Sequence, residues 1–173
     1  MVDFFPDTLV SRYSTSQTID TTSECIFYMY YNLESKNTLK LQKSIEKKSL
    51  ANYKAFDTAL VTIKTESTMH WDKSKKVFYK YLFKDETQYY PVPYFETEKL
   101  ERIGVNSGDI FSTKNISGLS NDFMIYVLES KSGLYWKGLK PNKYMPKDWK
   151  NGYSKGICIN QIKGIMIYWL IIW

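Results

Sequence analysis

Hydrophobic and polar positions are unevenly distributed along the chain, and the most apolar stretch is 165–173, where no residue is charged. This stretch is too short to cross a bilayer as a helix, which needs about 20 apolar residues. It is also rich in residues that favour β structure. A strand here would place two sets of side chains on opposite faces, namely Ile165, Ile167, Trp169, Ile171 and Trp173 against Met166, Tyr168, Leu170 and Ile172. Because both sets are apolar, the pattern predicts a central strand that is covered on both sides.

Other strands are predicted where β-branched and aromatic residues cluster, at 25–33, 59–65, 76–84, 123–129 and 156–160. The short segment 161–164 ends in glycine and predicts a hairpin between the last two strands. The polar connector 66–75 predicts a second hairpin, formed by 59–65 and 76–84.

From Ser35 to Phe56 the period of the pattern changes to that of a helix. One side carries Leu41, Ile45, Ser49, Asn52 and Phe56, and the other carries Lys36, Lys40, Lys43, Lys47, Lys48 and Lys54. A solvated helix surface is the simpler interpretation of the lysine side, and a basic binding face is the alternative. Residues 1–24 have little pattern and predict an irregular lead-in.

Together these segments predict an α+β fold. We expect a mostly antiparallel sheet of five to seven strands, one long helix packed on a face of it, and the C-terminal strand in a central position. A length of 173 residues, without an internal repeat or a linker, indicates a single domain over 1–173.

The chain is basic, with a formal net charge of +6. Of its 24 cationic residues only Arg12 and Arg102 are arginine, whereas recognition of phosphates and base edges favours the bidentate guanidinium group. Nucleic-acid binding is therefore a less favoured alternative. Cys25 and Cys158 fit no metal or redox motif. We expect buried free thiols, with a disulfide as the alternative in an exported chain.

The first residues show neither the basic nor the apolar region of a signal peptide, and no transmembrane segment is predicted. The default expectation is a soluble cytoplasmic protein, and an exported mature chain is the alternative.

The best candidate for a binding surface is the segment 134–155, predicted to be a long loop in which aromatic residues and lysines alternate. The candidate residues are Tyr135, Trp136, Lys140, Tyr144, Trp149, Lys150 and Tyr153, and Asp148 is the only acid in the segment. Flat rings beside ammonium groups suit an anionic partner. In the alternative and commoner arrangement, the rings pack as a lid on the sheet while the lysines point to solvent. A helical turn after Pro146 is a further possibility for part of the segment.

A weaker candidate is His70, which lies two residues before Asp72. A lone histidine beside an acid can serve as a general base, so a hydrolase or transferase using His70 is the second hypothesis. The sequence contains no glycine-rich phosphate loop and no nucleophile elbow, and we predict no cofactor and no metal. The preferred hypothesis is a non-enzymatic binding or protein-interaction domain whose partner is a protein or an anionic glycan.

Overall fold

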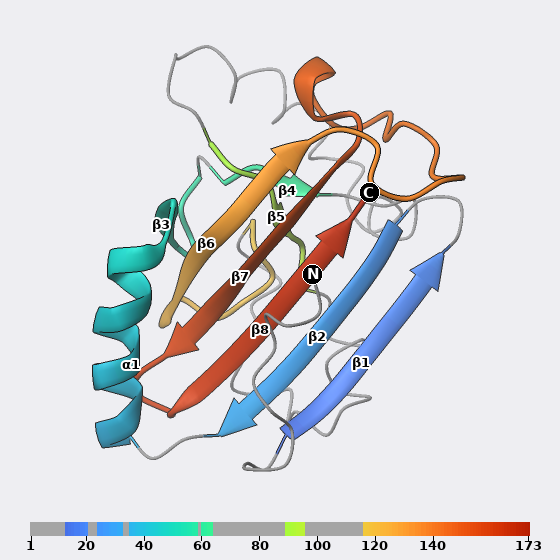
Figure 1. The fold of residues 1–173 in the computed structure, drawn as a ribbon. Helices are drawn as coiled ribbons and strands as arrows, with labels where there is room; N and C mark the ends of the chain where they lie inside the picture. The colour runs from blue at the N-terminus through green and yellow to red at the C-terminus, as the bar shows by residue number, and fades with distance from the viewer. Residues whose placement is uncertain (1–12, 21–23, 33–34, 59, 64–88, 96–115) are drawn as a thin grey trace.

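The computed structural model describes residues 13–20, 24–32, 35–58, 60–63, 89–95 and 116–173, with side chains from Leu39 onward. Within these ranges one α-helix accompanies two sheets (Figure 1). The predicted α+β class, with a mainly antiparallel sheet and one helix, is confirmed at this level. No helix in the described ranges is long and apolar enough to cross a membrane.

The larger sheet has six strands in the order β1-β2-β8-β7-β6-β3, and every neighbouring pair is antiparallel. The strands are β1 (Tyr13–Asp20), β2 (Glu24–Asn32), β3 (Ala51–Lys54), β6 (Phe123–Ser132), β7 (Gly152–Asn160) and β8 (Ile165–Ile172). The C-terminal strand β8 is internal, with β2 on one side and β7 on the other. The predicted hairpin joins β7 to β8, and Gly164 takes a positive φ of 66° in its turn.

Both faces of β8 are buried, with the alternation that the sequence predicts. One set packs in the main core, and it consists of Ile165, Ile167, Trp169, Ile171 and Trp173. The short parallel strands β4 (Thr62–Ile63) and β5 (Val92–Pro93) cover this face. On the opposite face Met166 packs with Ile45 of the helix, and Leu170 and Ile172 pack with Leu139. The helix and the segment that contains Leu139 therefore each cover a part of this second face.

Two glycines of β7 allow the rings of Trp169, in β8, and of Trp173, directly after β8, to lie against the backbone of β7. A Cβ atom at Gly152 would stand 2.8 Å from the Lys131 carbonyl oxygen and 2.8 Å from the Trp173 ring. At Gly156 it would collide with the Tyr126 carbonyl oxygen and with the Trp169 ring. The absence of a side chain at these positions makes room for the largest residues of the core.

The helix α1 (Ser35–Lys48) is shorter than predicted. Its stripe of Leu41 and Ile45 packs on the sheet. Lys47 and Lys48 lie in the last turn, where the helix dipole favours positive charge. The predicted continuation to Phe56 is wrong, because Ala51–Lys54 form the edge strand β3 beside β6. From Asn52 to Phe56 burial follows a two-residue period, since Tyr53 and Ala55 are buried while Asn52, Lys54 and Phe56 are exposed.

The structure differs from the sequence prediction in three more places. Strand β1 lies within the lead-in that was expected to be irregular. Strand β7 begins at Gly152, so the predicted loop ends earlier and Tyr153 belongs to a strand. The described part of the predicted strand 59–65 pairs with β5 in parallel, and its predicted hairpin partner 76–84 lies outside the described residues. Cys158 is a buried free thiol, as expected, and the side chain of Cys25 lies outside the described part of the structure.

Candidate functional site

A β-bulge in β6 determines which side chains line the start of the candidate surface. The register of β6 on β7 shifts between Val127 and Glu129. Before the bulge, Val127 points into the main core. After it, Glu129 pairs with Lys155 and Lys131 pairs with Tyr153, so charged residues of β6 lie on the same face as Leu139 and the helix. An extra residue in one strand reverses the alternation of its side chains in this way.

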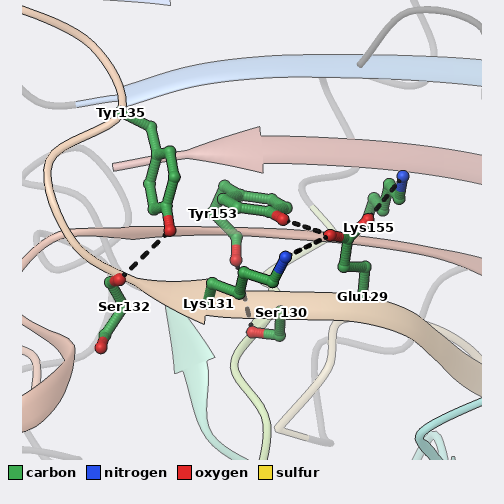
Figure 2. Close-up of polar contacts among 7 residues, drawn as sticks. All are labelled: Glu129, Ser130, Lys131, Ser132, Tyr135, Tyr153 and Lys155. Carbon is green, nitrogen blue, oxygen red and sulfur yellow. Dashed lines mark hydrogen bonds and ion pairs between the residues drawn. The ribbon is translucent and has the colours of Figure 1, made fainter.

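Glu129 is the centre of a cluster of polar side chains on this face, shown in Figure 2. Its carboxylate lies 2.8 Å from the Lys155 ammonium nitrogen and 3.0 Å from that of Lys131, and it accepts a hydrogen bond from the Tyr153 hydroxyl. Ser130 lies on the other side of β6, where its hydroxyl donates to the Tyr153 carbonyl oxygen over 3.3 Å. Tyr153 is therefore held at its ring end and at its backbone.

The cluster shifts the protonation equilibria of its members. The hydrogen bonds from Lys155, Tyr153 and Lys131 lower the pKa of Glu129 to about 2. The hydrogen bond to Glu129 raises the pKa of Lys131. Burial, followed by the bond to the carboxylate, raises the pKa of Tyr153. Glu129, Lys131 and Tyr153 keep their ordinary charge at neutral pH, and a carboxylate of such low basicity is poorly suited to accept a proton in catalysis.

Tyr153 supports the first ring of the exposed segment. The rings of Tyr135 and Tyr153 meet edge to face with centroids 4.5 Å apart, a favourable geometry for aromatic pairs. The Tyr135 hydroxyl donates to the Ser132 carbonyl oxygen over 3.4 Å (Figure 2). Gly133 allows the turn between them with a φ of 129°, and its N–H donates to Asn151. Tyr135 is thus fixed although 41% of its surface is exposed.

We call residues 133–151, which link β6 to β7, the connection. It is anchored on both faces of the sheet, because Leu139 packs with Leu170 and Ile172 while Met145 joins the main core on the opposite side. The Trp173 indole N–H donates to the Trp149 carbonyl oxygen over 2.8 Å, and the two rings lie 6.0 Å apart. The connection is therefore an ordered segment at the end of the sheet (Figure 1).

A single 3-10 turn, η4 (Lys147–Trp149), follows Pro146, where the sequence allowed a helical turn. It is preceded by a turn in which the Asn142 side chain accepts from the Tyr144 N–H over 2.9 Å. The Asn142 N–H donates to the Lys150 carbonyl oxygen over 2.7 Å and closes this part of the connection.

The candidate residues divide into three groups by exposure. Tyr135, Trp136 and Lys140 are exposed, Tyr144, Trp149 and Lys150 are half-buried, and Tyr153 is buried. The lysines of the connection mostly reach solvent, the exposed ones being Lys137, Lys140, Lys143 and Lys147. Neither alternative from the sequence describes the whole segment. Trp149 and Tyr153 pack inward as a lid would, while Tyr135 and Trp136 form a small exposed shelf.

Sequence reasoning missed three contributors to this surface. Glu129 was placed at the end of the predicted strand 123–129 without a role and Lys131 was left outside it, although two opposite charges spaced by two residues share a strand face. Leu134 was not singled out and is 62% exposed. The glycines Gly133 and Gly138, both with positive φ, mark the two ends of the tip and are the signal that could have located it.

The catalytic candidate His70 lies outside the described residues. Residues 89–95 are described, and Phe95 belongs to the main core. Among the residues that the structure describes, no group of three or more His, Cys, Asp or Glu side chains could hold a metal ion.

No protein-family model, curated protein or solved structure matches the chain. The class that the fold and the surface define is an antiparallel α+β protein with an exposed, lysine-flanked aromatic connection. Its function has to be argued from this surface.

Proposed function

We propose that the protein is a non-enzymatic binding module that engages an anionic partner through the connection. The observation that carries the proposal is the exposure of Tyr135 and Trp136, each 41%, on a segment whose lysines also reach solvent. Exposed apolar residues that adjoin one another mark interaction sites on monomeric proteins, and aromatic faces beside ammonium groups suit an anionic partner.

The order of the connection supports the proposal. Binding by a flexible loop loses affinity because the loop must be ordered at the same time. Here Tyr135 is already fixed by Tyr153 and Ser132, and Leu139 and Met145 hold the segment on opposite faces of the sheet. Most of the ordering cost is therefore met by folding, before a partner arrives.

The charges of the connection indicate the kind of partner. Its lysines are accompanied by a single acid, the exposed Asp148. Such a field attracts anions and accelerates their approach. An acidic protein surface and an anionic glycan both meet this requirement. Nucleic acid is less favoured, because the connection contains no arginine for bidentate contacts.

The chemistry of the nearby cluster argues for binding and against acid–base catalysis at this place. Glu129 has a pKa of about 2 and its oxygens are occupied by Lys155, Lys131 and Tyr153. Its role in the proposal is to position Tyr153, which in turn supports Tyr135.

The test is retention on immobilised heparin and on immobilised poly-L-glutamate, which represent an anionic glycan and an acidic protein. The variant K137A/K140A/K147A removes three exposed lysines of the connection, and K40A/K43A/K47A removes three exposed lysines of α1 as the control. We expect the wild type and the control to be retained on at least one matrix, and the connection variant to elute at clearly lower salt. Equal elution of the two variants would show that net charge alone drives retention and would overturn the proposal.

A further inference from the structure

The tip of the connection is more apolar than a soluble polyanion requires. Leu134 is 62% exposed, and the next two residues, Tyr135 and Trp136, are each 41% exposed. The three are consecutive and lie between Gly133 and Gly138, whose φ angles of 129° and 99° turn the chain at both ends of the tip. An aliphatic side chain such as Leu134 gains little from contact with a carboxylate or a hydroxyl-covered sugar, whereas its transfer into hydrocarbon is favourable.

We propose that the anionic partner is the surface of a lipid bilayer that contains acidic headgroups. The inference rests on the proposed function, since it uses the same connection, and it adds the identity of the partner. Leu134 and Trp136 enter the boundary between headgroups and acyl chains, where tryptophan and tyrosine are favoured because one end of the ring is apolar and the other polar.

The lysines around the tip supply the electrostatic part of the attachment. Lys137 and Lys140 follow the tip, and Lys131 precedes it with its side chain 61% exposed. A lysine is a compact charge on a flexible stem, which suits mobile headgroups better than fixed bidentate acceptors. Each lysine near an acidic membrane contributes on the order of a fivefold gain in affinity.

The position of the tip in the fold allows contact with a flat surface. Figure 1 shows the connection beyond the end at which β6 stops and β7 begins. The edge-to-face contact of Tyr135 on Tyr153 keeps the tip presented, so Leu134 and Trp136 do not have to leave a packed site before they insert. A preformed apolar tip within a basic surrounding is the arrangement expected for a peripheral membrane protein.

The experiment is cosedimentation with vesicles of phosphatidylcholine alone and of phosphatidylcholine mixed with phosphatidylserine, with the heparin and poly-L-glutamate matrices run in parallel. The variant L134A/W136A removes the apolar tip. The control L50A/F56A removes two other exposed apolar side chains, which are 52% and 46% exposed. We expect binding to the mixed vesicles only, a loss of about tenfold or more in the tip variant, and little change in the control.

Insertion has its own readout in quenching by lipids brominated on their acyl chains. Trp169 and Trp173 are fully buried and Trp149 is half-buried, so Trp136 is the exposed tryptophan among those that the structure describes. We expect brominated mixed vesicles to quench the wild-type fluorescence and to quench the variant W136F clearly less.

Four outcomes would overturn the inference. Retention on heparin or poly-L-glutamate without vesicle binding would leave the proposed function in place and exclude the bilayer. Vesicle binding that L134A/W136A and L50A/F56A share equally would exclude the tip. Equal quenching of the wild type and W136F would exclude insertion at Trp136. Failure on the matrices and on the vesicles together would overturn the proposed function as well.

Discussion

Replacing Glu129 with glutamine tests the cluster that supports the exposed rings. The pKa of the carboxyl group falls from its ordinary value of 4.5 to about 2 in the folded protein. At about 1.4 kcal/mol for each tenfold change, this difference corresponds to an upper limit of about 3 kcal/mol. The side chain is 32% exposed, so solvent screens part of the interaction, and we expect E129Q to lower the free energy of unfolding by about 1–2 kcal/mol near neutral pH.

The pH dependence of this loss follows from the sign of the shift. A carboxyl group whose pKa is lowered by folding stabilises the native state above its unfolded pKa, here 4.5. The stabilisation disappears as the pH falls from 4.5 toward about 2, where the folded carboxylate is also protonated. The difference between wild type and E129Q should therefore shrink across this range and vanish near its lower end.

The assay is urea-induced unfolding followed by far-ultraviolet circular dichroism at a series of pH values. The variant E46Q makes the same chemical change at an exposed position of α1 and serves as the control. Its unfolding free energy should stay within about 0.5 kcal/mol of the wild type. An E129Q protein as stable as the wild type at neutral pH, or a difference that persists at the acid end of the series, would refute the assignment of Glu129 as the centre of the cluster.

Two further predictions concern the sheet that carries the connection. G156A should lower the free energy of unfolding by more than about 3 kcal/mol, because the new Cβ collides with a carbonyl oxygen of β6 and with the buried Trp169 ring. Denaturant-induced unfolding measures this change. A loss below about 1 kcal/mol would contradict the packing of Trp169 on β7. Cys158 should not react with a thiol reagent such as Ellman's reagent in native C25S protein, because it is fully buried and burial raises the pKa of its thiol. Rapid labelling under native conditions would show that β7 is accessible to solvent and would contradict the burial of Cys158.

Several features of the fold were predictable because they are local or repeat along a strand. The alternation of 165–173 follows from the geometry of a strand, and its two sets of side chains do pack on opposite faces. The turn before Ile165 was predictable from Gly164. In contrast, residues after Lys48 satisfy a helical period and a strand period at once. Pairing with β6 and the burial of Tyr53 decide between them.

The candidate site shows the same division. The order of residues in the sequence was enough to locate the segment in which aromatic residues and lysines are interspersed. It could not show which rings face solvent, because that depends on which of them meet a covered part of the sheet. Trp149 finds Trp173 and Tyr153 lies within β7, whereas Trp136 is left at the tip.

What the chain determined by itself is the set of strongly patterned strands and the basic, aromatic character of the connection, since both depend on residue type and spacing. Only the tertiary structure decided the roles of Glu129 and Tyr153. A bulge in β6 turns Glu129 toward Lys155, and the pairing of β6 with β7 places Tyr153 under Tyr135. These contacts join residues more than 15 positions apart, so they arise from the register between strands, which no local pattern contains.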